Sequence, residues 1–305
     1  MQKTIRIAMT LTLATAAAAA SWVAQAQEPV PATAAKQGKG GGGKGTGGRG
    51  GQARPDMNTM VRPIAMHDTV WIADMTQLEI RDSLNAGKTT ALLFIGGMED
   101  NGPYITVSQH NDVSRAMCDM IARKLGNALC APILGMAPGN PETAKNPGSI
   151  QLSPETFKAV LSDTATSLKT EGFKNLFLMA DHGQSARNIT EITKPLAEKW
   201  KDSGVMIAYV PEFYDYAPQV ENFEHEVLKV TEVREGYHDD YYVAAISVAI
   251  DPNQARMPER IKANKTTING VELNSPKAVE DGKKIMEFRM NAAVTAIQKL
   301  MADKK

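Results

Sequence analysis

The fold of this chain is indicated first by the stretch TALLFI at residues 90–95. It is a continuous apolar run of strand length, and the run NLFLMA at residues 175–180 is of the same kind. Strands that are apolar on both faces, and that alternate with amphipathic segments, are typical of a parallel sheet covered by helices. The sequence therefore predicts an α/β layer fold, in which ligands bind beyond the carboxyl ends of the strands.

The spacing of apolar residues around these two runs predicts the neighbouring elements. Two further strands are predicted at residues 128–134 and 205–210. Helices are predicted where apolar residues recur at helical spacing, and glycine or a hydroxyl-bearing residue marks several of their ends. The predicted helices span residues 76–85, 112–125, 153–172, 185–201, 239–249 and 276–301.

Residues 1–26 have the features of a secretory signal peptide. Lys3 and Arg6 precede an apolar, alanine-rich stretch, and Ala24-Gln25-Ala26 forms a small-residue cleavage pattern. An uncleaved membrane anchor is the alternative, but the apolar stretch is short for a membrane span and is interrupted by hydroxyl-bearing residues. We expect cleavage before Gln27, a secreted or periplasmic protein, and no membrane span after cleavage.

Residues 27–56 form a low-complexity, glycine-rich segment that includes KQGKGGGGKGTGGRGG. Such a composition buries too little apolar surface to offset its chain entropy, so we expect a disordered tether. Binding of phosphate or RNA is the alternative, but the segment has no aromatic side chain for stacking and no strand–helix frame for a phosphate loop. The remaining residues, 57–305, are long enough for one large domain.

The charge balance of the predicted domain argues against nucleic acid as a partner. The whole chain has 34 basic and 34 acidic residues, and seven of the basic but only two of the acidic ones precede residue 57. The domain is therefore mildly acidic, whereas nucleic-acid-binding domains are typically basic.

The domain contains two cysteines, Cys118 and Cys130. Cys118 falls in a predicted helix and Cys130 in a predicted strand, so the sequence does not fix the distance between them. A disulfide, which an oxidising compartment permits, and two buried thiols therefore remain alternatives. A metal role is not expected, because the chain has no Cys-x-x-Cys spacing.

Two loops that follow predicted strands carry residue types that bind metals. The loop after the first apolar run contains Glu99 and His110, and the loop after the second contains His182. A third histidine, His238, directly precedes a predicted helix. A glutamate and two or three histidines that converge at strand ends are the ligand set of a catalytic zinc or a related divalent metal.

Four segments of the chain carry a family resemblance: GGMEDNGPY with the following SQHND, NPGSIQLSPETF, MADHGQS, and YHDDYYVAAISVAIDP. In this order they resemble motifs of the creatininase (creatinine amidohydrolase) family. That family has Gly-Ser-x-Glu-x-His-Gly-Pro-His and then Thr-Asp in the first place, and Asn-Gly-His-Gly-Gly-Asn after a later strand. The resemblance spans roughly residues 78–258 and implies a three-layer α/β/α fold with a mainly parallel central sheet.

The resemblance assigns roles to single residues. Glu99 and His182 match a metal-binding glutamate and histidine of the family, and His238 matches a histidine near its reaction centre. His110 stands where the family has an aspartate that bridges two metals. Three further positions depart from the metal-binding and catalytic residues of the family: Asn101, Gln184 and Val243.

These departures predict one divalent metal per chain instead of two. We expect Glu99, His110 and His182 to be its ligands, with zinc as the metal and manganese or iron as alternatives. His238 and Asp240 are the predicted catalytic residues, which carry the proton to the leaving nitrogen. Five further residues would complete the surroundings of the metal, orient its ligands or replace one of them: Asp112, Asp181, Asp239, Asn101 and Gln184.

Such a site predicts hydrolysis by a metal-activated water, and the resemblance implies that the bond is a C–N bond of a small or cyclic amide. We therefore expect an exported metal-dependent amidohydrolase that acts on a small-molecule amide and, as in the family, forms a homo-oligomer. The alternative is a non-catalytic periplasmic binding or structural protein that kept the fold. Asn101, Gln184 and Val243 favour this alternative, whereas His110, at an interval where a ligand is needed, favours the enzyme.

Overall fold

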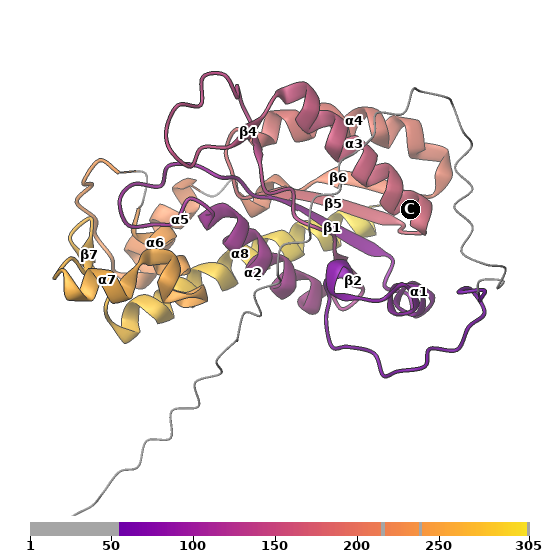
Figure 1. Ribbon diagram of the computed structural model, residues 1–305, viewed down its shortest axis with the longest axis horizontal. Helices are drawn as coiled ribbons and strands as arrows, with labels where there is room; N and C mark the ends of the chain where they lie inside the picture. Colours follow the sequence, from indigo (N-terminus) through magenta and orange to yellow (C-terminus); the bar gives the residue numbers. More distant parts are fainter. Residues whose placement is uncertain (1–54, 215–216, 238–239, 304–305) are drawn as a thin grey trace, which may run out of the picture. The chain divides into compact units, whose positions relative to one another are not determined.

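The computed structural model describes residues 55–214, 217–237 and 240–303 (Figure 1). The predicted signal peptide, the predicted tether up to residue 54, and the candidate residues His238 and Asp239 lie outside the described residues. All described residues belong to one compact unit, Arg54–Lys305.

A four-stranded parallel sheet with the strand order β2-β1-β5-β6 forms the centre of the fold. Its strands are β1 (Thr90–Ile95), β2 (Ala128–Cys130), β5 (Asn175–Ala180) and β6 (Met206–Tyr209). Ile95 lies opposite Ala180 at the carboxyl ends of the two central strands. The loops that follow β1 and β5 therefore start side by side, at the edge of the sheet where ligands bind in parallel α/β folds.

Helices cover both faces of this sheet, with α3 and α4 on one side and α2 and α8 on the other (Figure 1). Leu92 and Phe94 of β1 point into a core shared with α2, α6 and α8, whereas Leu93 and Ile95 point into a core shared with α3 and α4. These helices are α2 (Gln109–Leu125), α3 (Pro154–Glu171), α4 (Ser185–Trp200), α6 (Tyr241–Ile250) and α8 (Pro276–Ala302). The arrangement confirms the predicted three-layer α/β/α fold with a mainly parallel central sheet.

Shorter elements connect these layers. They are η1 (Ile72–Asp74), α1 (Gln77–Asn85), β3 (Ala137–Pro138), β4 (Gln151–Leu152), η2 (Lys201–Ser203), η3 (Pro211–Phe213), α5 (Ala217–Phe223), the π-helical turn η4 (Glu224–Leu228), η5 (Pro252–Ala255), α7 (Met257–Lys262), β7 (Thr267–Ile268) and β8 (Val271–Glu272). Strands β3 and β4 pair in parallel, and β7 and β8 form an antiparallel hairpin. Of these elements only α1 was predicted, because the others are too short for an apolar period to be recognised.

Strand β2 is shorter than the strand predicted at residues 128–134. Pro132 follows it closely, and proline has no backbone N–H to donate to a ladder of hydrogen bonds. The chain returns to the sheet at Leu134, which forms an isolated parallel bridge with Ile95.

Helix α8 lies very close to α6. A Cβ atom at Gly282 would lie 2.1 Å from the carbonyl oxygen of Ala245, so the two helices approach each other at a position where no other residue fits. Ile285 and Arg289 belong to the same buried stripe of α8, so this stripe is apolar apart from one buried arginine and Asp281 near its start.

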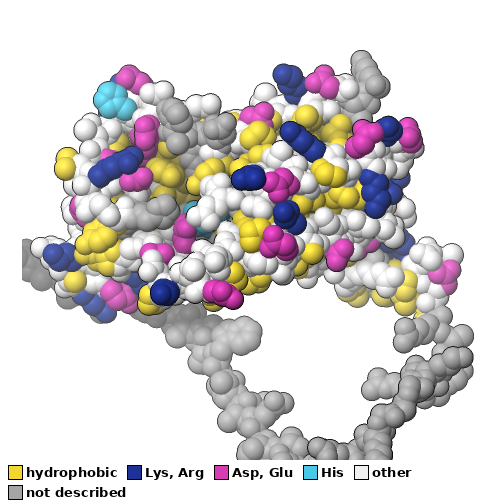
Figure 2. Space-filling model, turned by 90° about the horizontal axis from the view of Figure 1, so that it is seen from above, with side chains coloured by type: hydrophobic (Ala, Val, Ile, Leu, Met, Phe, Trp, Pro, Cys, Tyr) yellow, Lys and Arg dark blue, Asp and Glu magenta, His cyan; other side chains and the backbone are white. Residues whose placement is uncertain are grey.

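The surface is mixed in character. On the face drawn in Figure 2, basic and acidic side chains are interspersed with apolar and uncharged ones, and neither sign of charge dominates. None of the described helices combines the length and the apolarity that crossing a membrane requires.

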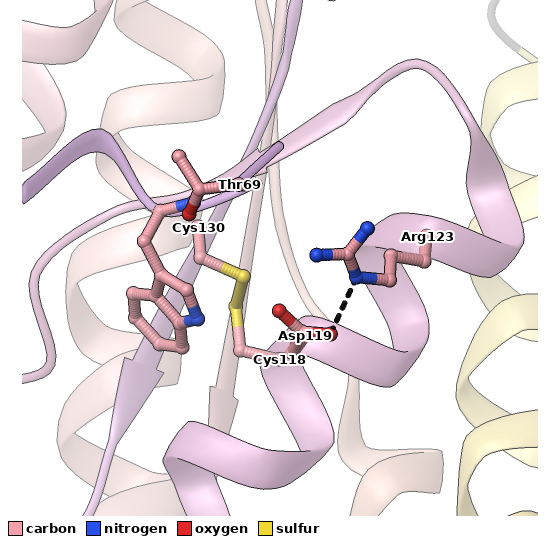
Figure 3. Close-up of a disulfide and its surroundings, with 6 residues drawn as sticks. Thr69, Cys118, Asp119, Arg123 and Cys130 are labelled. Atoms are coloured by element: carbon pink, nitrogen blue, oxygen red, sulfur yellow. Dashed lines mark hydrogen bonds and ion pairs between the residues drawn. A yellow bond between two sulfur atoms is a disulfide. The ribbon is translucent and has the colours of Figure 1, made fainter. Parts of the chain in front are cut away.

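A disulfide joins α2 to β2 (Figure 3). Cys118 and Cys130 are both fully buried, and their Cα atoms are 6.0 Å apart, a normal separation for a disulfide. The structure thereby decides between the two alternatives that the sequence left open. On the same helix Arg123 donates to Asp119 at 2.7 Å, beside the bridge (Figure 3).

Candidate active site

Two glycines at the end of β1 allow α2 to begin close to the sheet. A Cβ atom at Gly96 would lie 2.1 Å from Asn111 Oδ1, so a side chain there would exclude the first turn of the helix. Asn111 Oδ1 accepts a hydrogen bond from the Gly97 N–H at 3.1 Å. The helix begins at Gln109, earlier than the predicted residue 112, and His110 therefore lies in its first turn and not in the preceding loop.

Glu99, His110 and His182 meet at this end of the sheet. Glu99 Oε1 accepts a hydrogen bond from His110 Nε2, and Glu99 Oε2 accepts one from His182 Nε2 at 3.1 Å. The two imidazole rings cross edge to face, with centroids 5.4 Å apart. Both histidines are buried and Glu99 is partly buried, so two imidazole nitrogens point at one sheltered carboxylate.

A buried ion pair holds His110 from the other side. Asp181 Oδ2 accepts a hydrogen bond from His110 Nδ1 at 2.9 Å, and Asp181 Oδ1 accepts one from the Arg289 guanidinium. Asp181 and Arg289 are each only 2 % exposed. The guanidinium also lies over the Phe213 ring, 4.3 Å from its centroid. A continuous chain of hydrogen bonds thus runs from Arg289 through Asp181 and His110 to Glu99.

The charges along this chain alternate in sign. Burial alone would raise the pKa of Asp181, but the Arg289 guanidinium and His110 hold it below its ordinary value. Burial alone would lower the pKa of His110, but hydrogen bonds to Asp181 and Glu99 raise it to about 9. His110 is therefore an imidazolium at neutral pH, and its positive charge lies between the carboxyl groups of Asp181 and Glu99.

Tyr214 lies against the loop that carries His182. A Cβ atom at Gly183 would lie 3.7 Å from the Tyr214 hydroxyl oxygen, an ordinary van der Waals distance, so the phenol lies directly beside this loop. Burial, followed by the charge of Asp181, raises the pKa of Tyr214 to about 12. The hydroxyl therefore stays protonated at neutral pH.

Three candidate residues are engaged elsewhere in the described structure. Asn101 is buried, and its Nδ2 donates to the Thr106 carbonyl at 3.0 Å, so it closes its own loop. Asp112 Oδ2 accepts a hydrogen bond from Ser108 Oγ at 2.9 Å. Gln184 is exposed at the N-terminus of α4. The predicted roles of these three side chains beside a metal stay predictions.

Asp240, the second predicted catalytic residue, contacts Asn269 and Arg234. It lies at the N-terminus of α6, with its Oδ1 3.4 Å from Asn269 Nδ2 and 4.0 Å from Arg234 Nε. The catalytic role of Asp240 stays a prediction. His238 and Asp239 lie outside the described residues, so their roles stay predictions.

Two residues of the site were missed by the sequence analysis. Arg289 left a signal, since an arginine at a position of the buried stripe of α8 requires a buried anion as its partner. That partner, Asp181, is 108 residues away in the chain, so the pairing could not be predicted from spacing. Tyr214 left no signal, because it follows a short 3-10 turn without an apolar period.

The donor chemistry of Glu99, His110 and His182 fits a divalent metal. Two imidazole nitrogens and a carboxylate are the ligands of many catalytic zinc sites, and the second nitrogen of a ligating histidine is usually held by a carboxylate, as Asp181 holds His110. His182 Nδ1 is buried and has no hydrogen-bond partner among the described residues. In the present side-chain arrangement Glu99 touches both Nε2 atoms, and no three His, Cys, Asp or Glu side chains of the described part are spaced to surround an ion. Metal binding through the two Nε2 atoms would therefore require both nitrogens to give up the protons that they donate to Glu99.

Imidazole and carboxylate donors at the carboxyl edge of a parallel sheet are typical of α/β enzymes that hydrolyse their substrates with a metal. The family model for creatininase, described as creatinine amidohydrolase, matches residues 73–295. The chain therefore belongs to the creatininase family, whose members are hydrolases that act on C–N bonds of amides.

Individual relatives are distant. The creatinine amidohydrolase of Pseudomonas putida is 25 % identical over 132 residues, which are 41 % of this chain and 50 % of the relative. The match thus spans half the length of that curated relative.

Solved structures are similar in fold over more of the chain. A manganese creatininase is 18 % identical with a TM-score of 0.57, over 76 % of this chain and 98 % of the other. A mutant creatininase of Zn–Zn type is 17 % identical with a TM-score of 0.58, over 76 % and 98 %. A putative creatinine amidohydrolase from Bacteroides fragilis is 14 % identical with a TM-score of 0.56, over 77 % and 97 %.

Proposed function

We propose that this chain is an exported, metal-dependent amidohydrolase that cleaves a C–N bond of a small or cyclic amide. The observation that carries the proposal is the meeting of Glu99, His110 and His182 at the carboxyl edge of the sheet. Membership of the creatininase family supports the reaction class. One related structure holds creatine, which supports a small, polar substrate.

Glu99, His110 and His182 would hold one divalent metal. Related structures contain manganese or zinc, and both metals suit this set of donors, with iron as the alternative. When bound, such a metal lowers the pKa of a water molecule and polarises the carbonyl of the substrate. One ion is proposed because Asn101 is engaged within its own loop and Gln184 is exposed.

The residues around the cluster orient it and hold its protons. Asp181 fixes the ring of His110 through Nδ1, so that Nε2 faces Glu99. Arg289 keeps Asp181 ionised and therefore able to accept that hydrogen bond. The protonated hydroxyl of Tyr214 would donate to an oxygen of the substrate, and His238 would give a proton to the leaving nitrogen.

Export and assembly belong to the same proposal. The signal-like residues 1–26 and the disulfide between Cys118 and Cys130 support an oxidising compartment, outside the cytoplasm or outside the cell. A homo-oligomer is proposed from the family alone, and size-exclusion chromatography with light scattering would measure its mass.

The variant His182→Ala tests the proposal. Wild-type protein purified without chelators should carry about one divalent metal per chain and hydrolyse a member of a panel of creatinine, lactams and small linear amides. His182→Ala should lose both properties while it remains folded, with a stability cost of about 1–2 kcal/mol. His225→Ala is the matched control, because His225 is an exposed histidine that contacts Glu226. Full metal content in well-folded His182→Ala would end the metal-site proposal.

The same measurements distinguish the proposed amidohydrolase from the alternative, a non-catalytic binding or structural protein. It is favoured by the positions of Asn101 and Gln184, which offer no ligands for a second metal. It requires wild-type protein that is folded, free of metal after incubation with zinc or manganese, and inactive on the whole panel. Metal binding with hydrolysis would exclude it.

A further inference from the structure

A second polar pocket lies beside η4. It has a volume of about 270 Å³ and shares no residue with the chain of hydrogen bonds from Arg289 to Glu99. Its lining comes from α5, η4 and the segment that follows: Glu221, Glu224, His225, Val230, Thr231, Glu232 and Arg234. Pockets that enclose drug-sized ligands are usually larger, so this one fits a small molecule.

Glu224 is the feature that distinguishes this pocket from an ordinary acidic surface. The residue is only 5 % exposed, although it is one of the residues that line the pocket. Its Oε1 atom is fully buried and has no hydrogen-bond partner among the described residues. A buried carboxylate oxygen without a donor costs free energy, and structures rarely leave one in that state.

The neighbours of Glu224 cannot supply the missing donor. Glu232 Oε2 accepts from the Tyr241 N–H at 2.7 Å and from Asn269 Nδ2 at 2.6 Å, so these donors are committed. Arg234 NH2 donates to Glu221 at 3.2 Å, at the exposed rim. Lys277 binds Asp281 and the Leu228 carbonyl. Around Glu224, carboxylates outnumber the cations that face them.

The surplus of negative charge favours the protonated form of Glu224. Burial raises its pKa to about 8, and the nearby carboxylates of Glu232, Asp240, Glu221 and Asp281 add to the effect. At neutral pH the empty pocket thus keeps a proton on Glu224, because an isolated carboxylate is unfavourable there. A cation with an N–H donor would satisfy the same oxygen and compensate the same charge.

A metal ion is the less suitable occupant. Divalent metals need several protein ligands around one point, whereas in this pocket Glu221 is already bound by Arg234, and Glu232 by the Tyr241 N–H and Asn269. A single orphaned oxygen in a small, negatively charged pocket instead matches one N–H of an organic cation.

We propose that this pocket binds a small organic cation with N–H donors, an ammonium or a guanidinium, through a hydrogen bond to Glu224 Oε1. The surrounding carboxylates supply the electrostatic attraction, and Glu224 supplies the directional contact. The proposal does not depend on the metal site or on amide hydrolysis.

Calorimetric titration of the full mature chain tests it with four probes. Methylammonium and methylguanidinium carry N–H donors, tetramethylammonium carries the charge without a donor, and urea carries donors without the charge. The first two should bind, with dissociation constants in the millimolar range or below, and the last two should bind at least tenfold more weakly. Whichever of the first two binds more tightly identifies the class of cation.

Two variants localise the binding. Glu224→Gln should raise the dissociation constant of the cation at least tenfold, whereas Glu226→Gln should leave this constant unchanged. Glu226 is an exposed neighbour that pairs with His225 and does not line the pocket, so Glu226→Gln is the same chemical change made outside the pocket. Removing an unpaired buried carboxylate should not unfold the protein, which a thermal melt of each variant checks.

Three results would overturn the proposal. The first is the absence of binding by wild type, or equal binding by Glu224→Gln. The second is binding of tetramethylammonium as tight as that of methylammonium, since the contact to Oε1 would then be dispensable. The third is displacement of the organic cation by calcium at lower concentration, which would make the pocket a metal site.

Discussion

Arg289 is a buried cation whose partner is a buried anion. We therefore expect the stability of the fold to be especially sensitive to substitution at this position. Its guanidinium binds Asp181 and lies over Phe213, and both charged residues are almost without contact with water. If one partner of such a pair is removed, the other remains as an uncompensated charge in a medium of low polarity. The positions of Asp181 and His110 therefore depend on Arg289, which binds Asp181 directly.

Arg289→Met should destabilise the fold strongly. The substitution roughly preserves the length and apolar stem of the side chain but leaves Asp181 unpaired, so we expect a loss of about 3–5 kcal/mol in the free energy of unfolding. Urea denaturation followed by circular dichroism measures it. Arg187→Met serves as the control, since Arg187 forms an exposed ion pair with Glu191 on α4, and it should cost less than about 0.5 kcal/mol. Similar losses for both variants would contradict the assignment.

Glu224 gives the stability of the protein a dependence on pH with a defined sign. Its pKa is raised to about 8 in the folded protein from an ordinary 4.5, so between these values the folded state holds a proton that the unfolded state releases. The contribution of Glu224 to the free energy of unfolding is therefore largest below about pH 4.5. It falls as the pH rises towards 8 and stays at its lowest value above that.

Glu224→Gln should remove this dependence. The variant should gain stability over wild type as the pH rises from 5 to 8, by on the order of 3 kcal/mol at the upper end. Urea denaturation in buffers without organic cations measures the difference at each pH. Glu226→Gln, which removes an exposed charge, should follow the wild-type curve. An unchanged gap between Glu224→Gln and wild type from pH 5 to 8 would show that Glu224 is ordinarily ionised.

At the scale of single elements, the close contact between α6 and α8 depends on Gly282, which has no side chain. Alanine in place of glycine normally stabilises a helix by about 1 kcal/mol. At Gly282, however, the added Cβ would lie 2.1 Å from the Ala245 carbonyl oxygen. Backbone atoms cannot yield as a flexible side chain does, so the overlap outweighs the gain in helix propensity.

Gly282→Ala should therefore lower the free energy of unfolding by about 1–3 kcal/mol. The expected cause is a displacement of α8 relative to α6, which thermal and urea unfolding would detect as a lower midpoint. Lys283→Ala is the control, because Lys283 is the exposed next residue on the same helix and should change stability by less than about 0.5 kcal/mol. A gain in stability for Gly282→Ala would mean that the helices lie further apart.

The long elements were predictable from the sequence, because their apolar patterns are longer than one period. β1 and β5 have the predicted bounds, and α3 begins after Ser153, which caps it. The start of α2 was not predictable, since it depends on Gly96 meeting Asn111, a contact that no local pattern encodes. That shift matters for function, because it moves His110 from a loop into a helix.

The site was partly predictable for a related reason. Parallel strands bring their carboxyl ends together, so Glu99 and His182 could be expected near each other. Which side chains occupy the space between them is decided by pairings across the whole chain, such as Asp181 with Arg289. The expectations for Asn101 and Asp112 did not account for hydrogen bonds within their own loop and helix turn. The role of the cluster as a metal site stays a prediction.

At the scale of the whole molecule, the family match covers residues 73–295 and the described unit begins at Arg54. We predict that the mature chain starts at Gln27, directly after the small residues Ala24-Gln25-Ala26. N-terminal sequencing or intact mass of protein recovered from the periplasm or the culture medium measures the start. Protein that retains Met1 in its native compartment would contradict both cleavage and the proposal of export by this route.

The bridge between Cys118 and Cys130 can be recognised in a peptide digest. Trypsin cuts after lysine and arginine, and Arg123 and Lys124 lie between the two cysteines. Oxidised protein should therefore yield residues 116–123 and 125–145 as one cross-linked species, which separates into two masses when a reductant is added. Protein made in a reducing cytoplasm should give the two peptides apart from the outset. The mass spectrum of one digest thus records the compartment in which the chain folded.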